Sequence, residues 1–249
     1  MRNLYTLFFI LSFLTSCTLQ NALKPARQSG FIEYKDDNLY NDIIPFDYVW
    51  SKKKRNEPKQ NFSKISLKIY GSEFLEKSHW KDSKSVAITN EEEYLESVEN
   101  IKNYFVEYFN EFLKEESKKE NKKLELVDPN TNEDFRLELA FTEISFGHPL
   151  FAGSTLLIPL PFASYLFDSV SSPYAAFEAK VINNKTGEVR VMFADKKFPK
   201  VKIIDFNKLR AESSVKEITE IWSREIVKSF LANTNEEVDK EARFSLLPW

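Results

Sequence analysis

Alternation of hydrophobic and polar residues predicts strands at five places in the chain. Apolar residues take every second position in the stretches 65–69, 124–127, 135–141, 177–181 and 189–193, which is the period of a half-buried strand. Asp128-Pro-Asn130 has turn-forming residues and joins the second stretch to the third. Asn183-Asn-Lys-Thr-Gly187 separates the last two and can supply the positive φ of a hairpin turn. The pattern therefore predicts one separate strand followed by two pairs.

Two further stretches place their hydrophobic residues at helical spacing. The first follows Thr89-Asn-Glu-Glu92, which has the spacing of a capping box, and should run to about Ser117. Its apolar stripe comprises Leu95, Val98, Ile101, Phe105, Phe109, Phe112 and Leu113. The stripe of the second comprises Val215, Ile218, Trp222, Ile226 and Phe230. One apolar face is typical of a helix packed on a core.

The order of these elements predicts the fold class. Strands clustered between two long helices indicate an α+β fold: a mostly antiparallel sheet of about five strands with two long amphipathic helices on one face. Glu178, Lys180 and Arg190 occupy alternate strand positions, so we expect the other face of the sheet to be partly in contact with water.

The first seventeen residues have the features of a lipoprotein signal peptide. Arg2 supplies the positive charge, and 4–14 is an apolar run of eleven residues, too short for the roughly 20 that cross a bilayer. Leu14-Thr-Ser-Cys17 resembles the lipobox of bacterial lipoproteins. The resemblance implies diacylglycerol on the thiol of Cys17, cleavage before it, and acylation of its amine with a fatty acid such as palmitate. Stable anchoring takes two or more acyl chains.

The residues around this anchor predict the location and the domain organisation. Among lipoproteins, aspartate just after the cysteine favours the inner membrane, and here Thr18 and Leu19 follow, so we expect attachment to the outer membrane with the domain facing the periplasm. We expect a signal peptide at 1–16, a lipidated N-terminus and tether at 17–60, a single α+β domain at 61–233, and a loose C-terminal tail at 234–249. Aromatic groups at 31–34 and 46–50 should pin parts of the tether to the domain.

The stretch 144–167 contains no Asp, Glu, Lys or Arg in 24 residues. Two glycines and three prolines, at 147, 149, 153, 159 and 161, exclude one uninterrupted helix. It is either an apolar connection folded into the core or an exposed surface for a partner, because large exposed apolar patches mark interaction sites. The candidate interaction residues are Phe151, Leu156, Leu157, Phe162 and Phe167.

Composition limits the chemistry. A chain of 249 residues with 42% hydrophobic residues, 29% charged residues and a net charge of −3 suits a globular fold and argues against a basic nucleic-acid binder. The single cysteine excludes an internal disulfide, and neither His79 nor His148 belongs to a pair with metal-ligand spacing. No Gly-rich phosphate loop and no Gly-x-Ser-x-Gly elbow occurs. We therefore predict no cofactor and no metal, and assign no catalytic residue.

Short motifs connect the chain to a family. Ser29-Gly-Phe31 with Tyr34, Thr186-Gly-Glu188 and Ala194-Asp195 resemble those of bacterial outer-membrane lipoproteins of unknown function. The resemblance implies an α+β fold and a location, and no activity. Our leading hypothesis is a lipid-anchored cell-envelope protein that is not an enzyme and binds an envelope protein through 144–167. The alternatives are an envelope hydrolase acting on glycan or peptide with carboxylate catalysis, and a periplasmic carrier of an apolar ligand.

Overall fold

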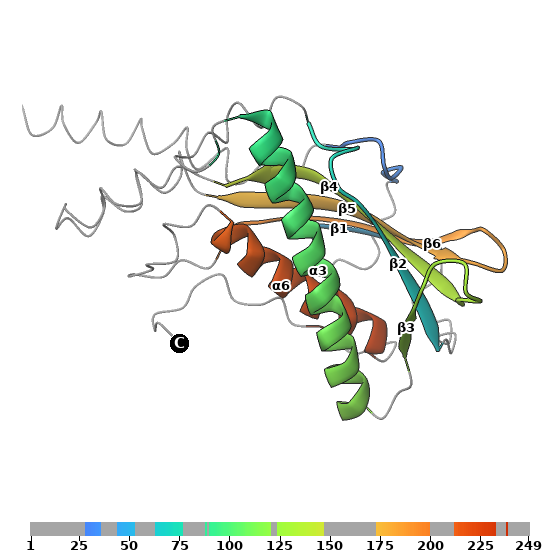
Figure 1. Ribbon diagram of the computed structural model, residues 1–249. Coiled ribbons are helices and arrows are strands. Elements are labelled where there is room, and N and C mark those ends of the chain that lie inside the picture. The colour runs from blue at the N-terminus through green and yellow to red at the C-terminus, as the bar shows by residue number, and fades with distance from the viewer. Residues whose placement is uncertain are drawn as a thin grey trace, which may run out of the picture.

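The computed structural model describes residues 28–35, 44–52, 63–76, 88, 90–120, 124–146, 173–199, 212–232 and 238. They contain β1 (Tyr48–Ser51), β2 (Lys64–Tyr70), α3 (Glu91–Lys119), β3 (Glu125–Val127), β4 (Phe135–Ser145), β5 (Tyr174–Asn183), β6 (Val189–Lys197) and α6 (Ser213–Leu231). The strands form one sheet in the order β1-β6-β5-β4-β2-β3. Both helices lie on the same face of this sheet and cross each other there (Figure 1).

The sheet is mixed and six-stranded, so the prediction of a mostly antiparallel sheet of about five strands was wrong. β1, β6, β5 and β4 pair antiparallel, whereas β2 runs parallel to β3 on one side and to β4 on the other. Helix α3 carries the chain back along the sheet after β2, so the next strand repeats the direction of β2. The additional strand is β1, whose four residues are too few to establish an alternating pattern.

The turn after β3 does not make the hairpin that its sequence suggested. It carries the chain from one side of β2 to the other, and Asp134 fastens it to the start of β2. The Asp134 carboxylate accepts backbone hydrogen bonds from Ser63 at 3.0 Å and Lys64 at 3.2 Å. The bond from the Ser63 amide does most to hold the pKa of Asp134 below its ordinary value. The Asp134 side chain thus adds to the parallel strand pairing of β2 with β4, which begins at Ile65 and Phe135.

The predicted hairpin between β5 and β6 is present. Ala179 pairs with Phe193 and Val181 with Val191. Gly187 has φ +69°, a conformation that glycine adopts without the steric cost other residues meet. The turn between the strands therefore forms as its residues predict.

The helix-covered face of the sheet holds the main hydrophobic core. The α3 stripe is buried there from Val98 to Leu113, which confirms its interpretation as a core-facing surface, although Leu95 is exposed. Helix α3 begins one residue later than predicted, because Asn90 is the N-cap and accepts a hydrogen bond from the Glu93 amide at 3.0 Å. The largest fully buried side chains include Trp222, Phe105, Phe109, Phe141, Phe177, Ile65 and Leu139.

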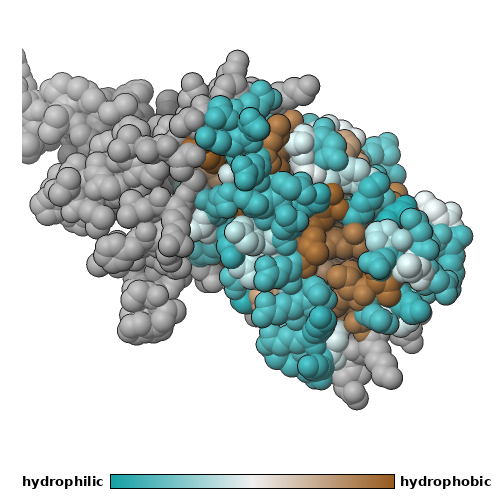
Figure 2. All heavy atoms as spheres, in the orientation of Figure 1, coloured by the Kyte–Doolittle hydropathy of each residue, from teal (hydrophilic) through white to brown (hydrophobic). Residues whose placement is uncertain are grey.

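The solvent side of the helices is mostly hydrophilic. Figure 2 shows hydrophilic surface along α3, and a hydrophobic area beside it toward β2 and β3. Leu67 and Ile69 of β2 and Leu126 of β3 are only partly buried against the core. The helices therefore leave this edge of the sheet incompletely covered.

The opposite face is covered differently, by an extended segment that we call the strap, residues 28–35. It packs on a smaller cluster of buried residues, Phe31, Ile32, Tyr48, Ala140, Met192 and Ala194. We call this side of the sheet the strap face. This face is partly in contact with water, as expected, at Lys180 and Arg190, whose side chains are 24% and 30% exposed. Glu178 is the exception, because the strap leaves its side chain fully buried.

Candidate functional site

The strap is held by one carboxylate. Glu178 lies in β5, and its two oxygens accept four hydrogen bonds from strap residues. The Ser29 amide donates at 2.9 Å and the Ser29 hydroxyl at 2.7 Å. The Ile32 amide donates at 3.2 Å and the Tyr34 hydroxyl at 3.0 Å. Neutral donors thus satisfy a buried charge, which would otherwise be costly.

A glycine lets the strap wrap around this carboxylate. Gly30 has φ +85°, a left-handed conformation that strains any residue with a Cβ even where space is open. Open space is present, since a Cβ at Gly30 would meet no atom within 4 Å. The bend also brings the Phe31 amide to the Ser29 hydroxyl at 3.2 Å. Conformation rather than packing therefore requires glycine here.

Aromatic contacts hold the other side of the strap. The Phe31 ring lies edge-on to Tyr70, with centroids 5.2 Å apart, and to Phe74 at 4.9 Å. The Lys180 ammonium lies 4.4 Å from the Phe31 centroid, within the range of a cation–π interaction. The strap therefore combines hydrogen bonds to a charged group with burial of an aromatic side chain.

Tyr34 belongs to both sets of contacts. Its ring packs 4.6 Å from that of Tyr48, and its hydroxyl donates to Glu178. Burial, followed by the negative charge of Glu178, raises the pKa of Tyr34 well above its ordinary value. The proton in this hydrogen bond is therefore retained at every pH at which exposed tyrosines keep theirs.

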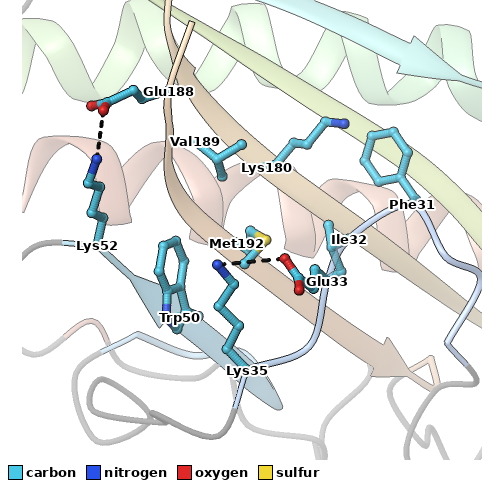
Figure 3. Close-up of a pocket in the computed structure, with 10 residues that line it drawn as sticks. All are labelled: Phe31, Ile32, Glu33, Lys35, Trp50, Lys52, Lys180, Glu188, Val189 and Met192. Atoms are coloured by element: carbon cyan, nitrogen blue, oxygen red, sulfur yellow. Dashed lines mark hydrogen bonds and ion pairs between the residues drawn. The ribbon is translucent and has the colours of Figure 1, made fainter. Parts of the chain in front are cut away.

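A cavity of about 480 Å³ opens beside the strap. Figure 3 views it with the helices behind the sheet. Its lining comes from the strap, β1, the end of β5 and β6, and comprises Phe31, Ile32, Glu33, Lys35, Trp50, Lys52, Lys180, Glu188, Val189 and Met192. The cavity thus lies where residues 31–52 meet the hairpin of β5 and β6.

Paired charges surround apolar groups in this cavity. Lys52 donates to Glu188 at 2.7 Å, and this hydrogen bond lowers the pKa of Glu188. Lys35 lies 3.6 Å from Glu33 and its ammonium is 4.5 Å from the Trp50 centroid. Such a surface can bind an apolar side chain or ring flanked by a polar group.

Other carboxylates of the strap face are also engaged in ion pairs. Glu138 accepts from Arg136 at 2.9 Å and lies 3.4 Å from the Lys180 ammonium. Glu143 accepts from Lys196 at 2.8 Å, and both side chains are largely buried. The pairs of Glu138 with Lys180 and of Glu143 with Lys196 link β4 to β5 and β6 across the sheet.

A second buried charged cluster lies under α6, on the helix side. Asp195 accepts a hydrogen bond from the Trp222 indole at 2.8 Å and lies 3.2 Å from the Lys197 ammonium. The same ammonium is bonded to Glu225 of α6. The Asp47 amide donates to Asp195 at 3.2 Å. This cluster fixes α6 to the sheet.

The residues predicted from the sequence as site residues lie outside the described part of the chain. They are the lipidation residue Cys17 and the interaction residues Phe151, Leu156, Leu157, Phe162 and Phe167. The two histidines lie outside it as well. At the start of the charge-free stretch, Ile144 and Phe146 are described and are buried in the core.

Sequence reasoning missed the role of Glu178 and the cavity. One signal for Glu178 was its place in Ala175-Ala-Phe-Glu-Ala, where a charge interrupts small and apolar residues. A second was the hydroxyl, glycine and aromatic pattern of 29–34, whose pinning to the domain was predicted and is confirmed. No signal along the chain reveals that the two lie together, because they are 149 residues apart.

Searches of the described residues for two other features gave negative results. No helix among them is both long enough and apolar enough to cross a bilayer. No group of three or more His, Cys, Asp or Glu side chains in the same ranges is arranged to hold a metal ion.

Comparison with known proteins gives distant structural neighbours alone. No family model and no curated protein sequence matches the chain. Protein XCC0632 from Xanthomonas campestris, assigned to the family model DUF330, covers 76% of this chain and 93% of its own at 11% identity and a TM-score of 0.36. PelC from Paraburkholderia phytofirmans, a dodecamer, covers 69% and 96% at 9% identity and a TM-score of 0.33. Scores this low support no inference about the fold, assembly or function of this chain.

Proposed function

We propose that this protein is a lipid-anchored component of the bacterial cell envelope that binds another envelope protein and carries out no catalysis. Cys17 is the acylated residue in this proposal, and the outer membrane is the attachment site. The lipobox Leu14-Thr-Ser-Cys17 supports the anchor. The motifs shared with outer-membrane lipoproteins of unknown function support the location.

The docking of the strap is the structural observation that best supports an anchored domain. Ser29 follows Cys17 by twelve residues and is hydrogen-bonded to a strand in the middle of the sheet. When a chain is bound to the sheet only twelve residues after its membrane anchor, the position of the domain is coupled to the membrane. An N-terminal extension that plays no part in positioning the domain does not require four hydrogen bonds to a buried carboxylate.

Binding, rather than catalysis, is supported by how the buried carboxylates are used. Glu178 holds the strap, Glu138 and Glu143 join strands, and Asp195 joins α6 to the sheet. These groups act as structural acceptors in the fold. The partner surface in this proposal is the charge-free stretch 144–167, and the cavity beside the strap is a second place for contact.

The anchor is tested by replacing Cys17. Cys17→Ala should abolish labelling with radioactive palmitate and leave the precursor uncleaved, because the thiol that accepts diacylglycerol is gone. Thr18→Ala is the matched control and should be labelled and processed normally. Palmitate incorporation into Cys17→Ala, or an unacylated wild-type chain in the cytosol, would contradict the proposal.

The partner surface is tested by crosslinking in intact cells followed by mass spectrometry of captured proteins. Phe151→Asp with Leu157→Asp should remove the partner that the wild type captures, while circular dichroism remains unchanged. Leu95→Asp, a change at an exposed position of α3, should keep it. Retained capture by the double variant excludes 144–167 as the binding surface.

A further inference from the structure

We infer that Glu178 sets how far the domain stands from the membrane, by acting as a latch on the N-terminal tether. This inference rests on the proposed lipid anchor at Cys17. Glu178 is then a positioning residue: by holding the strap, it sets the length of chain between Cys17 and the point at which the described N-terminal segment is fixed to the sheet.

The lengths of chain on either side of the strap define the effect. With the strap docked, twelve residues separate Cys17 from Ser29, a length of chain that spans at most ~43 Å. Among the described residues after the strap, the next that is fully part of the main core is Phe46, which stacks on Phe193 at 4.7 Å. Twenty-nine residues separate it from Cys17, and this length spans at most ~104 Å.

The contacts of the strap indicate that it can detach without unfolding the sheet. Four of its hydrogen bonds to the sheet converge on Glu178, and the Lys35 backbone adds contacts with the Tyr48 hydroxyl. Phe31 and Ile32 are also buried, but no residue of the strap pairs with a strand. The sheet beneath is held by its own strand pairing and by the helices on the far face. A segment outside the strand pairing opens at lower free energy than the paired core.

Glu178→Gln should weaken the latch selectively. The substituted amide keeps one acceptor oxygen and presents an N–H₂ group to donors that need an acceptor. Glu133→Gln is the matched control, because Glu133 is a buried carboxylate that accepts hydrogen bonds from Ser66 of β2 and from the Asn130 amide in the turn after β3, instead of from the strap. If Glu178→Gln does not fold, Ser29→Ala with Tyr34→Phe removes two donors and leaves the sheet unchanged.

The first measurement is hydrogen exchange of the strap amides in the full chain, which needs no lipid. Glu178→Gln should speed exchange at Phe31 and Ile32 by roughly tenfold or more, the loss expected for a hydrogen bond to a charged group. Exchange in β4 and β5 should change less, and Glu133→Gln should leave the strap at the wild-type rate. Unchanged strap exchange in Glu178→Gln overturns the latch.

The second measurement is the distance to the bilayer. Acylation blocks the thiol of Cys17, the only cysteine of the sequence, so Lys185→Cys, an exposed turn position, supplies the one thiol for a dye. Energy transfer from this dye to labelled lipid is then measured in phosphatidylethanolamine–phosphatidylglycerol vesicles. Glu178→Gln should lower the transfer efficiency, and Glu133→Gln should not. If Glu178→Gln speeds hydrogen exchange of the strap without lowering the transfer efficiency, Glu178 does not set the distance between the domain and the bilayer. A protein that carries no acyl group and does not bind vesicles refutes the lipid anchor, while the exchange result still decides the latch.

Discussion

The two faces of the sheet bury charge in opposite ways. On the helix face, Asp195 receives the Trp222 indole of α6 and the ammonium of Lys197 from its own strand. On the strap face, Glu178 receives amides and hydroxyls from a segment without regular structure. Both carboxylates are fully buried, and they lie one residue out of register on adjacent strands, since Glu178 pairs with Ala194.

The difference separates global from local stability. Trp222 and Glu225 belong to α6, which cannot move without breaking the core. Loss of the bonds around Asp195 should therefore lower the free energy of unfolding of the whole domain. The partners of Glu178 sit on a segment that can leave alone. A buried carboxylate can therefore brace the fold on one face and fasten a detachable segment on the other.

The largest effect is expected from Lys197→Met, which removes the ammonium shared by Asp195 and Glu225. Loss of one member of a buried ion pair costs about 3–5 kcal/mol, because the remaining charges stay buried. Denaturant unfolding should show this as a lower midpoint at an unchanged slope. Adding Glu225→Leu should restore part of the stability; a double variant less stable than the single would contradict the assigned pairing.

A smaller global effect is expected from Trp222→Phe. The substitution keeps an aromatic ring against Phe177, whose centroid lies 4.7 Å from that of Trp222, and removes the donor to Asp195. The free energy of unfolding should fall by about 1.5–3 kcal/mol, the range for hydrogen bonds to charged groups. Equal stability of variant and wild type would show that this hydrogen bond contributes nothing net.

The smallest global effect is expected from Tyr34→Phe, which removes a comparable donor to the other carboxylate. The strap amides should exchange faster. The free energy of unfolding should fall by less than in Trp222→Phe, because the loss cannot exceed the free energy of releasing the strap from the folded sheet. Native-state hydrogen exchange and denaturant unfolding on the same samples test this. A larger global loss for Tyr34→Phe than for Trp222→Phe would invert the comparison between the faces.

Local pattern identified the helices and most strands, because each depends on residues close in sequence. The α3 stripe and the β5–β6 turn with Gly187 are such cases. Strand direction was not predictable, since it depends on where α3 returns the chain and on Asp134 holding the start of β2. Of the site, aromatic pinning by the strap was predictable, and its carboxylate acceptor was not, because that contact joins distant parts of the chain.

The edge position of β1 has a consequence for biogenesis. Its partner β6 and the acceptor of the strap are both translated almost 150 residues later. Under the proposed export, a polypeptide that leaves a translocation pore N-terminus first would present the strap and β1 before their partners are available. The enzymes that would acylate Cys17 under this proposal would act during that interval, and the strap would dock once the C-terminal half has arrived.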